Sequence, residues 1–330
     1  MHAILAGIPA PCRPAAIIVG TCALLLLATA LLLPRARPPA LPDLASSSSS
    51  SAAAVRLDAR VERRSGNEVL WQLPPAATPP RAVLFAAPGC TIRATDFFDA
   101  SPGCPRCSGL PEERHFTRAG TPSSSCPAAR SAGLSTTTPP GRRLAGLPLV
   151  SIGASSGGYF VSALAARVRF SSIAVMIAEG VYGTMGDIPA GYPPALFVHM
   201  PKDAERARDV AASIGMLKAK RVDVREIKCD QFGVSAEFLA ERVPGLTRAV
   251  ADALVDVLRR KGFVDEKGLL KKDGRRTPWK KAAEEAKVLP EGFRLERHVT
   301  EELNLAFAFH EFTSLKNAEI FEWFESHMNH

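Results

Sequence analysis

The sequence from residue 147 to residue 164 reads Leu147-Pro-Leu-Val-Ser-Ile-Gly-Ala-Ser-Ser-Gly-Gly-Tyr-Phe-Val-Ser-Ala-Leu164. It opens with an apolar run of strand length and continues with apolar residues at helical spacing. Between them, Gly153-Ala-Ser155-Ser-Gly157 forms a G-x-S-x-G pattern, typical of a sharp turn that lifts a serine hydroxyl above a sheet. The pattern predicts a nucleophile elbow with Ser155 at its tip. The alternative is a glycine- and serine-rich turn without chemistry.

Two backbone amides near this turn are candidates for an oxyanion hole. The amide of Ser156 lies at the start of the predicted helix, where the positive end of the helix dipole favours a developing negative charge. The apolar strand Ala82–Ala87 ends in Pro88-Gly89-Cys90-Thr91, and in folds with such an elbow this loop supplies the second amide. Gly89 would let the backbone approach a substrate, and Cys90 or Thr91 would donate. The alternative is an ordinary loop.

A serine nucleophile needs a base and an acid that orients the base, and after an elbow these follow in the order Asp/Glu, then His. Asp203 follows the second apolar strand after the elbow, and His310 precedes the last predicted helix. We therefore predict a catalytic triad of Ser155, His310 and Asp203.

Each of these two assignments has rivals. Asp203 could instead cap the helix that follows it, and Glu179 ends the preceding strand. His310 could be packed among neighbouring phenylalanines, and His298 and His199 are weaker candidates for the base.

The rest of the chain predicts an α/β fold with a mostly parallel, doubly wound sheet, because apolar strands alternate with helices. Residues 55–73 read as a hairpin at a sheet edge, 232–300 as a helical insertion, and Thr313–His327 as a final amphipathic helix. Residues 119–146 offer no apolar periodicity, so we expect an irregular loop where one strand-helix unit is missing. The predicted strands are Ala82–Ala87, Leu147–Ile152, Ile173–Ala178, Ala195–Met200 and Val222–Ile227.

The N-terminal part predicts a membrane anchor. After a tail of residues 1–14, Ala15–Leu33 is continuously apolar and as a helix would be roughly 28 Å long, about the thickness of a bilayer core. A cleaved signal peptide is the alternative, but the run is long and Pro34-Arg35 is a poor cleavage site. Residues 34–54 read as a flexible linker. Charges flank the run almost evenly; the absence of N-x-S/T sequons slightly favours a cytosolic domain.

Composition narrows the function classes. The 330 residues carry a net charge of +8 without an aromatic-interleaved basic stripe, which argues against nucleic-acid binding. Cys104-Pro-Arg-Cys107 is half of a zinc pattern at most, and a local disulfide, a weak metal site and two unpaired thiols stay open. The sequence implies no metal and no organic cofactor.

The motifs Gly89-Cys90, Asp96-Phe97, Ser101–Cys107, Leu110–Arg114 and Gly153–Gly158 resemble a plant family of membrane-anchored α/β-hydrolase-like proteins. The resemblance covers about residues 55–118 and 145–330. It implies an α/β-hydrolase fold and no defined substrate. The order of the triad residues around the elbow predicts a serine hydrolase that acts on an ester, thioester or amide of a small or lipid-like molecule.

This chain departs from that family in two places. Pro88 stands where related proteins tend to have His, and residues 119–146 are atypical. A second hypothesis is therefore a catalytically impaired, membrane-tethered binding or scaffold protein.

Overall fold

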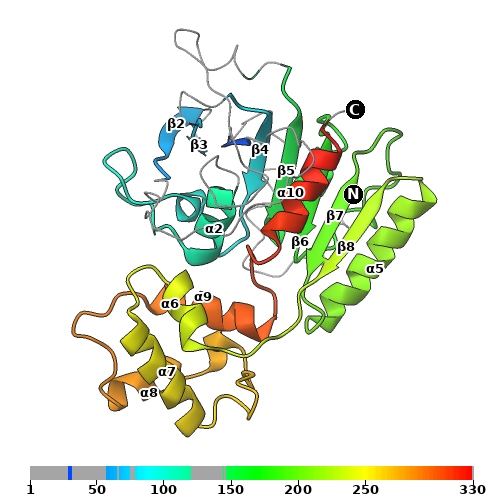
Figure 1. Cartoon of the computed structure of the whole chain (residues 1–330). Coiled ribbons are helices and arrows are strands. Elements are labelled where there is room, and N and C mark those ends of the chain that lie inside the picture. Colours follow the sequence, from blue (N-terminus) through cyan, green and yellow to red (C-terminus); the bar gives the residue numbers. More distant parts are fainter. Residues whose placement is uncertain are drawn as a thin grey trace, which may run out of the picture.

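The computed structural model describes residues 29–31, 57–64, 67–74, 79–119, 144 and 146–328. Within them, a six-stranded sheet forms the centre of the molecule (Figure 1), and its last five strands run parallel, as predicted. In spatial order the strands are β1 (Thr29–Leu31), β4 (Ala82–Ala87), β5 (Leu149–Ala154), β6 (Ser172–Met176), β7 (Ala195–His199) and β8 (Val224–Lys228).

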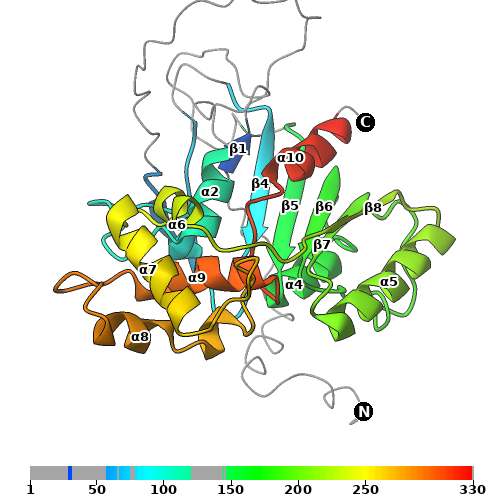
Figure 2. The ribbon, with the colours of Figure 1, turned by 60° about the horizontal axis from the view of Figure 1, so that its bottom comes forward.

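Helices cover both faces of this sheet, which explains why the interior strands β5, β6 and β7 are buried along almost their whole length, whereas the edge strand β8 is largely exposed. In Figure 2, α10 lies above the sheet and α4 and α5 lie below it. Along β6, Ile173 and Val175 belong to the core on the α4 and α5 face, and Ala174 and Met176 to the core on the other face. The bounds are η3 (Ala94–Phe97), α2 (Pro111–Ala119), α4 (Ser156–Leu164), α5 (Ala204–Ala219) and α10 (Asn317–Ser326).

The predicted N-terminal hairpin forms, but not at the edge of the main sheet. β2 (Arg60–Arg64) and β3 (Asn67–Trp71) pair with each other as a separate antiparallel sheet. The main-sheet edge next to β4 is taken by β1, which runs antiparallel to β4. The hairpin is held instead by side chains such as Leu57 and Leu70, which are buried in the same core as Phe116 and Phe321.

Most of the predicted membrane anchor lies outside the described residues. Its three described residues, Thr29–Leu31, form strand β1 rather than part of a helix. None of the helices in the described part of the chain is both long and apolar enough to cross a bilayer. The linker of residues 34–54 and nearly all of the atypical segment 119–146 also fall outside the described residues.

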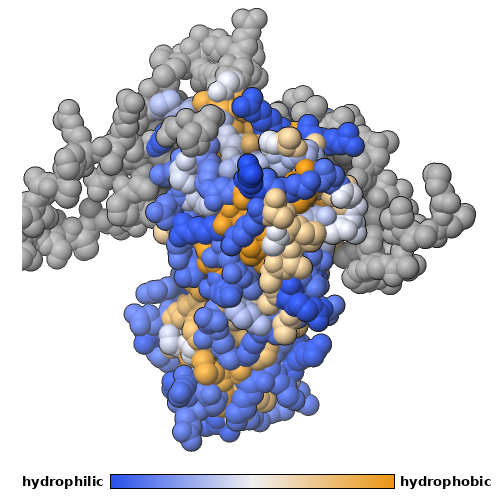
Figure 3. Space-filling view, turned by 90° about the vertical axis from the view of Figure 1, so that its right-hand side faces the viewer, coloured by the Kyte–Doolittle hydropathy of each residue, from blue (hydrophilic) through white to orange (hydrophobic). Residues whose placement is uncertain are grey.

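The helical insertion has a core of its own, which includes the fully buried Leu239, Leu254 and Leu303. Its last helix continues beyond the predicted end at residue 300. On the face shown in Figure 3, hydrophilic residues surround several apolar patches. Leu315, 42% exposed, is the one exposed large apolar side chain among the described residues. The elements are α6 (Ala236–Arg242), α7 (Arg248–Arg260), η4 (Gly274–Arg276), α8 (Trp279–Glu285) and α9 (Glu296–Phe307).

The structure decides between the alternatives for the Cys-x-x-Cys pair. Cys104 and Cys107 form a disulfide, with their Cα atoms 5.4 Å apart, and both are buried in the same core as Phe116 of α2. Cys90 is also disulfide-bonded. Among the described cysteines Cys229 is free, and burial raises the pKa of its thiol to about 12, so it is a poor nucleophile.

Candidate active site

Ser155 stands at the tip of the turn between β5 and α4, as predicted. Its backbone has φ 52° and ψ −117°, a conformation that residues with a side chain rarely adopt. The turn is possible because glycines surround it. A Cβ atom at Gly153 would collide with the backbone of Gly157, and one at Gly157 would collide with the carbonyl of Ala87. The G-x-S-x-G spacing is therefore required by the packing of β4, β5 and α4.

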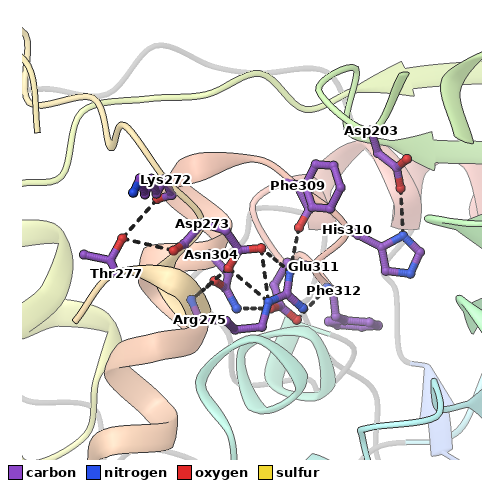
Figure 4. Close-up of polar contacts among 10 residues, drawn as sticks. All are labelled: Asp203, Lys272, Asp273, Arg275, Thr277, Asn304, Phe309, His310, Glu311 and Phe312. Atoms are coloured by element: carbon purple, nitrogen blue, oxygen red, sulfur yellow. Dashed lines mark hydrogen bonds and ion pairs between the residues drawn. The ribbon is translucent and has the colours of Figure 1, made fainter. Parts of the chain in front are cut away.

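Ser155, His310 and Asp203 form one hydrogen-bonded chain. Ser155 Oγ lies 3.0 Å from His310 Nε2, and His310 Nδ1 lies 2.9 Å from Asp203 Oδ2; Figure 4 shows the second contact. A carboxylate accepts the Nδ1 proton, which leaves Nε2 free to accept the proton of the serine hydroxyl. The His310 and Asp203 side chains are 29% and 16% exposed. The geometry is that of a nucleophile, a general base and an orienting acid.

Asp203 makes both of the contacts that its sequence position allowed. Its Oδ1 accepts a hydrogen bond of 3.3 Å from the Arg206 amide and so caps α5, while its Oδ2 faces His310. The helix cap fixes the carboxylate through the backbone. The capping bond through Oδ1 therefore also orients Oδ2, the oxygen that faces the His310 imidazole.

The rival acid Glu179 is bound elsewhere. It accepts a 2.5 Å hydrogen bond from the Tyr159 hydroxyl and pairs with the Arg206 guanidinium, which also donates to Tyr159 at 2.7 Å. Burial raises the pKa of Tyr159, which keeps it a neutral donor to this carboxylate. Glu179 thus joins α4 to α5 beside the triad.

The two rival histidines also have other surroundings. His199 is buried within β7, where its Nε2 lies 2.8 Å from Glu226 Oε1. His298 lies on α9, and burial lowers the pKa of its imidazole. Of the three histidines considered, the structure brings His310 to Ser155.

The loop after β4 passes directly against Ser155. A Cβ atom at Gly89 would lie 3.3 Å from the Ala154 carbonyl oxygen and 3.4 Å from Ser155 Cβ. Ser156 is the first residue of α4, where amides have no acceptor inside the helix. The approach of the loop agrees with the predicted positions of Ser156 and Cys90. Their role as oxyanion donors stays a prediction.

A buried group of charged residues next to the site was not predicted. We call Glu112 and Glu113 of α2, Glu301 and Glu302 of α9, and Arg242 of α6 the glutamate cluster. Arg242 pairs with Glu112 and, at 3.0 Å, with Glu302, and all four carboxyl groups are at most 6% exposed. Burial raises the pKa of Glu113 to about 8 and those of Glu301 and Glu302 well above the usual range.

No protein-family model and no curated protein matches the chain. Among solved structures, it is similar to MGS-M1, an α/β hydrolase from a Medee basin deep-sea metagenome library, at 15% identity and TM-score 0.24, over 34% of this chain and 52% of that one. It thus spans about half of that chain.

Two further structures cover 55% of this chain and 75% of theirs at 14% identity. One is a thermostable esterase from Pseudomonas putida ECU1011, with TM-score 0.29. The other is a mutant of esterase rPPE in complex with (S)-Ac-CPA, with TM-score 0.31. These TM-scores are too low to establish a common fold, so the strand order and the turn at Ser155 have to identify it. The parallel strands β4 to β8 and the turn after β5 fit an α/β-hydrolase fold.

Proposed function

We propose that the chain is a serine hydrolase that cleaves an ester, thioester or amide of a small or lipid-like molecule. The observation that carries the proposal is the hydrogen-bonded chain from Ser155 through His310 to Asp203. It is built on three separate elements of the fold, the turn before α4, the N-cap of α5 and the segment before α10.

The geometry suggests the following reaction. Ser155 Oγ attacks the substrate carbonyl carbon while His310 Nε2 takes the hydroxyl proton, and Asp203 stabilises the imidazolium through Nδ1–H. The amides of Ser156 and Cys90 would hold the oxyanion. The leaving group takes the proton from Nε2, and an acyl-serine remains. Water, deprotonated by His310 Nε2, then attacks this ester, and Nε2 returns the proton to Ser155 Oγ as the acid product leaves.

Hydrolysis of p-nitrophenyl esters of increasing chain length tests the proposal. We expect turnover by the wild type and a fall of kcat/KM by about 10⁴-fold in Ser155→Ala and in Asp203→Asn. Glu179→Gln is the matched control for the acid, and its loss should be far smaller. A correctly folded wild type that leaves ester, thioester and amide substrates intact would favour the non-catalytic scaffold instead.

We also propose that the apolar run of residues 15–33 tethers the enzyme to a membrane. Its length and apolarity support the proposal. The pairing of Thr29–Leu31 with β4 competes with it, since these residues cannot lie in a bilayer and in the sheet at once. Carbonate extraction should leave the full chain in the membrane pellet and release a chain without residues 1–33. Release of the full chain would rule out a spanning anchor.

A further inference from the structure

We propose that Asn304 of the helical insertion is a positioning residue for His310; the inference rests on the proposed function. Residues 308–314, which we call the His310 loop, connect α9 to the segment before α10. Asn304 and its partner Arg275 bind this loop on both sides of His310. The insertion would thus hold the general base in place.

The His310 loop needs external support because its backbone is unfavourable. Ala308 has φ 57° and His310 has φ 49°, in the left-handed region that residues with a Cβ atom avoid. Such conformations persist where surrounding contacts fix them. His310 must also keep two hydrogen bonds at once, at 3.0 Å to Ser155 and 2.9 Å to Asp203. A small displacement of the loop would break one of them.

Asn304 is 3% exposed and uses both atoms of its amide group. Oδ1 accepts a 3.1 Å hydrogen bond from the Arg275 amide, and Nδ2 donates a 2.9 Å hydrogen bond to Glu311 Oε2. Its main-chain carbonyl accepts the Ala308 amide at 2.9 Å. One side chain therefore joins η4, α9 and the residue directly after His310.

Arg275 holds the residue directly before His310. Its Nη2 donates to the Phe309 carbonyl at 3.1 Å, and its guanidinium is fixed by Asp273 at 2.8 Å. Figure 4 shows Phe309, held by Arg275, and Glu311, held by Asn304, on the two sides of His310. The segment thus has a polar anchor at each neighbour of the imidazole.

The donor and the acceptor of the hydrogen bond between Asn304 and Glu311 can be exchanged by substitutions that keep the size and shape of both side chains. In Asn304→Asp, a second carboxyl group would face Glu311 inside the protein. Burial raises the pKa of Glu311 to about 7, so above that pH two carboxylates would face and repel each other. In the double variant Asn304→Asp/Glu311→Gln, the Gln side chain donates and the Asp side chain accepts. The Asp carboxylate can still accept the Arg275 amide. The double variant should therefore restore the position of the His310 loop.

The first experiment measures kcat and KM for p-nitrophenyl acetate at a pH above the pKa of about 7 that burial gives Glu311. We expect Asn304→Asp to lower kcat by about 10- to 100-fold with little change in KM, since a shift of about 1 Å in a reacting group has this effect. The double variant should regain most of the loss. Arg275→Ala should lower kcat, whereas Arg276→Ala, the neighbouring exposed arginine, should not. Equal kcat in wild type and Asn304→Asp, or no recovery in the double variant, would overturn the inference.

The second experiment does not depend on hydrolysis. The proton on His310 Nδ1, bonded to Asp203, should give a far-downfield NMR signal in the wild type, identified by its loss in Asp203→Asn. We expect the signal to be lost in Asn304→Asp and to return in the double variant. If the wild type hydrolyses nothing but this pattern holds, the proposed function fails and the positioning role stands. If Asn304→Asp keeps the signal, the positioning role is wrong even in an active enzyme.

Discussion

The triad and the glutamate cluster are both polar, but they are built in opposite ways. In the triad, the hydroxyl, both imidazole nitrogens and both carboxylate oxygens have a partner, and its acid and base are partly exposed. In the glutamate cluster, four carboxyl groups are buried; Glu112 and Glu302 pair with Arg242, whereas Glu113 lies against Glu301 without a cation of its own among the ion pairs of the described residues.

This difference implies that the triad residues and the glutamate cluster affect different properties of the protein. The triad gains its geometry from a turn, a helix cap and a supported loop, so its side chains need contribute little to folding. The glutamate cluster lies between α2 and the helical insertion, and its buried charges are costly unless they are paired or protonated. We therefore expect substitutions in the triad to change activity, and substitutions in the glutamate cluster to change stability and its dependence on pH.

The largest expected effect on stability belongs to Arg242→Met. It leaves Glu112 and Glu302 buried without their cation, and removing one partner of a buried ion pair typically costs about 3–5 kcal/mol. Urea unfolding at pH 7 measures the loss. Arg248→Met is the control, because Arg248 pairs with Asp252 on the surface and is 61% exposed. Similar urea midpoints of unfolding for Arg242→Met and Arg248→Met would contradict the comparison.

The second prediction concerns pH. Glu113 faces Glu301, Glu112 and Glu311, and burial raises its pKa from the usual 4.5 to about 8 in the folded protein. Between these two values the folded state holds a proton that the unfolded state has lost. The contribution of Glu113 to stability is therefore fully present below pH 4.5 and is lost as the pH rises through 8.

In Glu113→Gln, the free energy of unfolding should fall less steeply with rising pH than in the wild type. Urea unfolding at pH 5, pH 6.5 and pH 8 measures this dependence. The exposed Glu266→Gln is the control. An unchanged pH profile in Glu113→Gln would mean that the cluster does not titrate as described.

The third prediction tests the turn that carries Ser155. In Gly157→Ala the new Cβ would meet the Ala87 carbonyl, so we expect a loss of about 1–3 kcal/mol from overpacking. Gly215→Ala is the control, because Gly215 lies within α5 with open space around it. That change should stabilise the protein by about 0.5–1 kcal/mol. Thermal unfolding distinguishes the two signs, and a neutral Gly157→Ala would remove the reason for the G-x-S-x-G spacing.

The smallest expected effect on stability belongs to Asp203→Asn. Asn caps helices about as well as Asp, so the Arg206 amide keeps its acceptor and the free energy of unfolding should change by less than about 1 kcal/mol. Activity, by contrast, should nearly vanish. A large loss of stability in this variant would mean that Asp203, like the glutamate cluster, supports folding, and would contradict the comparison.

The order of the parallel strands and the spatial meeting of three triad candidates could be predicted from sequence. The strands were visible because buried strands are apolar on both faces, and the elbow because its glycines are required by close backbone contact. Ser155, Asp203 and His310 each follow or precede an element that reaches the same edge of the sheet. Connectivity therefore brings them together although His310 is far away in the chain.

The glutamate cluster and the support of the His310 loop could not be predicted in this way. Glu112, Glu113, Glu301 and Glu302 have the pattern of solvent-exposed helix residues, and they are buried because α2 and α9, far apart in the chain, pack against each other. Asn304 looks like any polar residue on a helix until Arg275 and Glu311 are seen on either side of it. The prediction of a hairpin at the edge of the main sheet is wrong, because β1 occupies the edge next to β4 and the hairpin strands pair only with each other.

Mass spectrometry of the wild type treated with a fluorophosphonate probe tests the central claim most directly. The probe phosphonylates a serine whose hydroxyl is activated by a base, so we expect one adduct, on the peptide that contains Ser155. Ser155→Ala should carry no adduct, and His310→Ala should react far more slowly, because the base is missing. A folded wild type without an adduct, or an adduct on another serine that persists in Ser155→Ala, would contradict the assignment of Ser155 as the nucleophile.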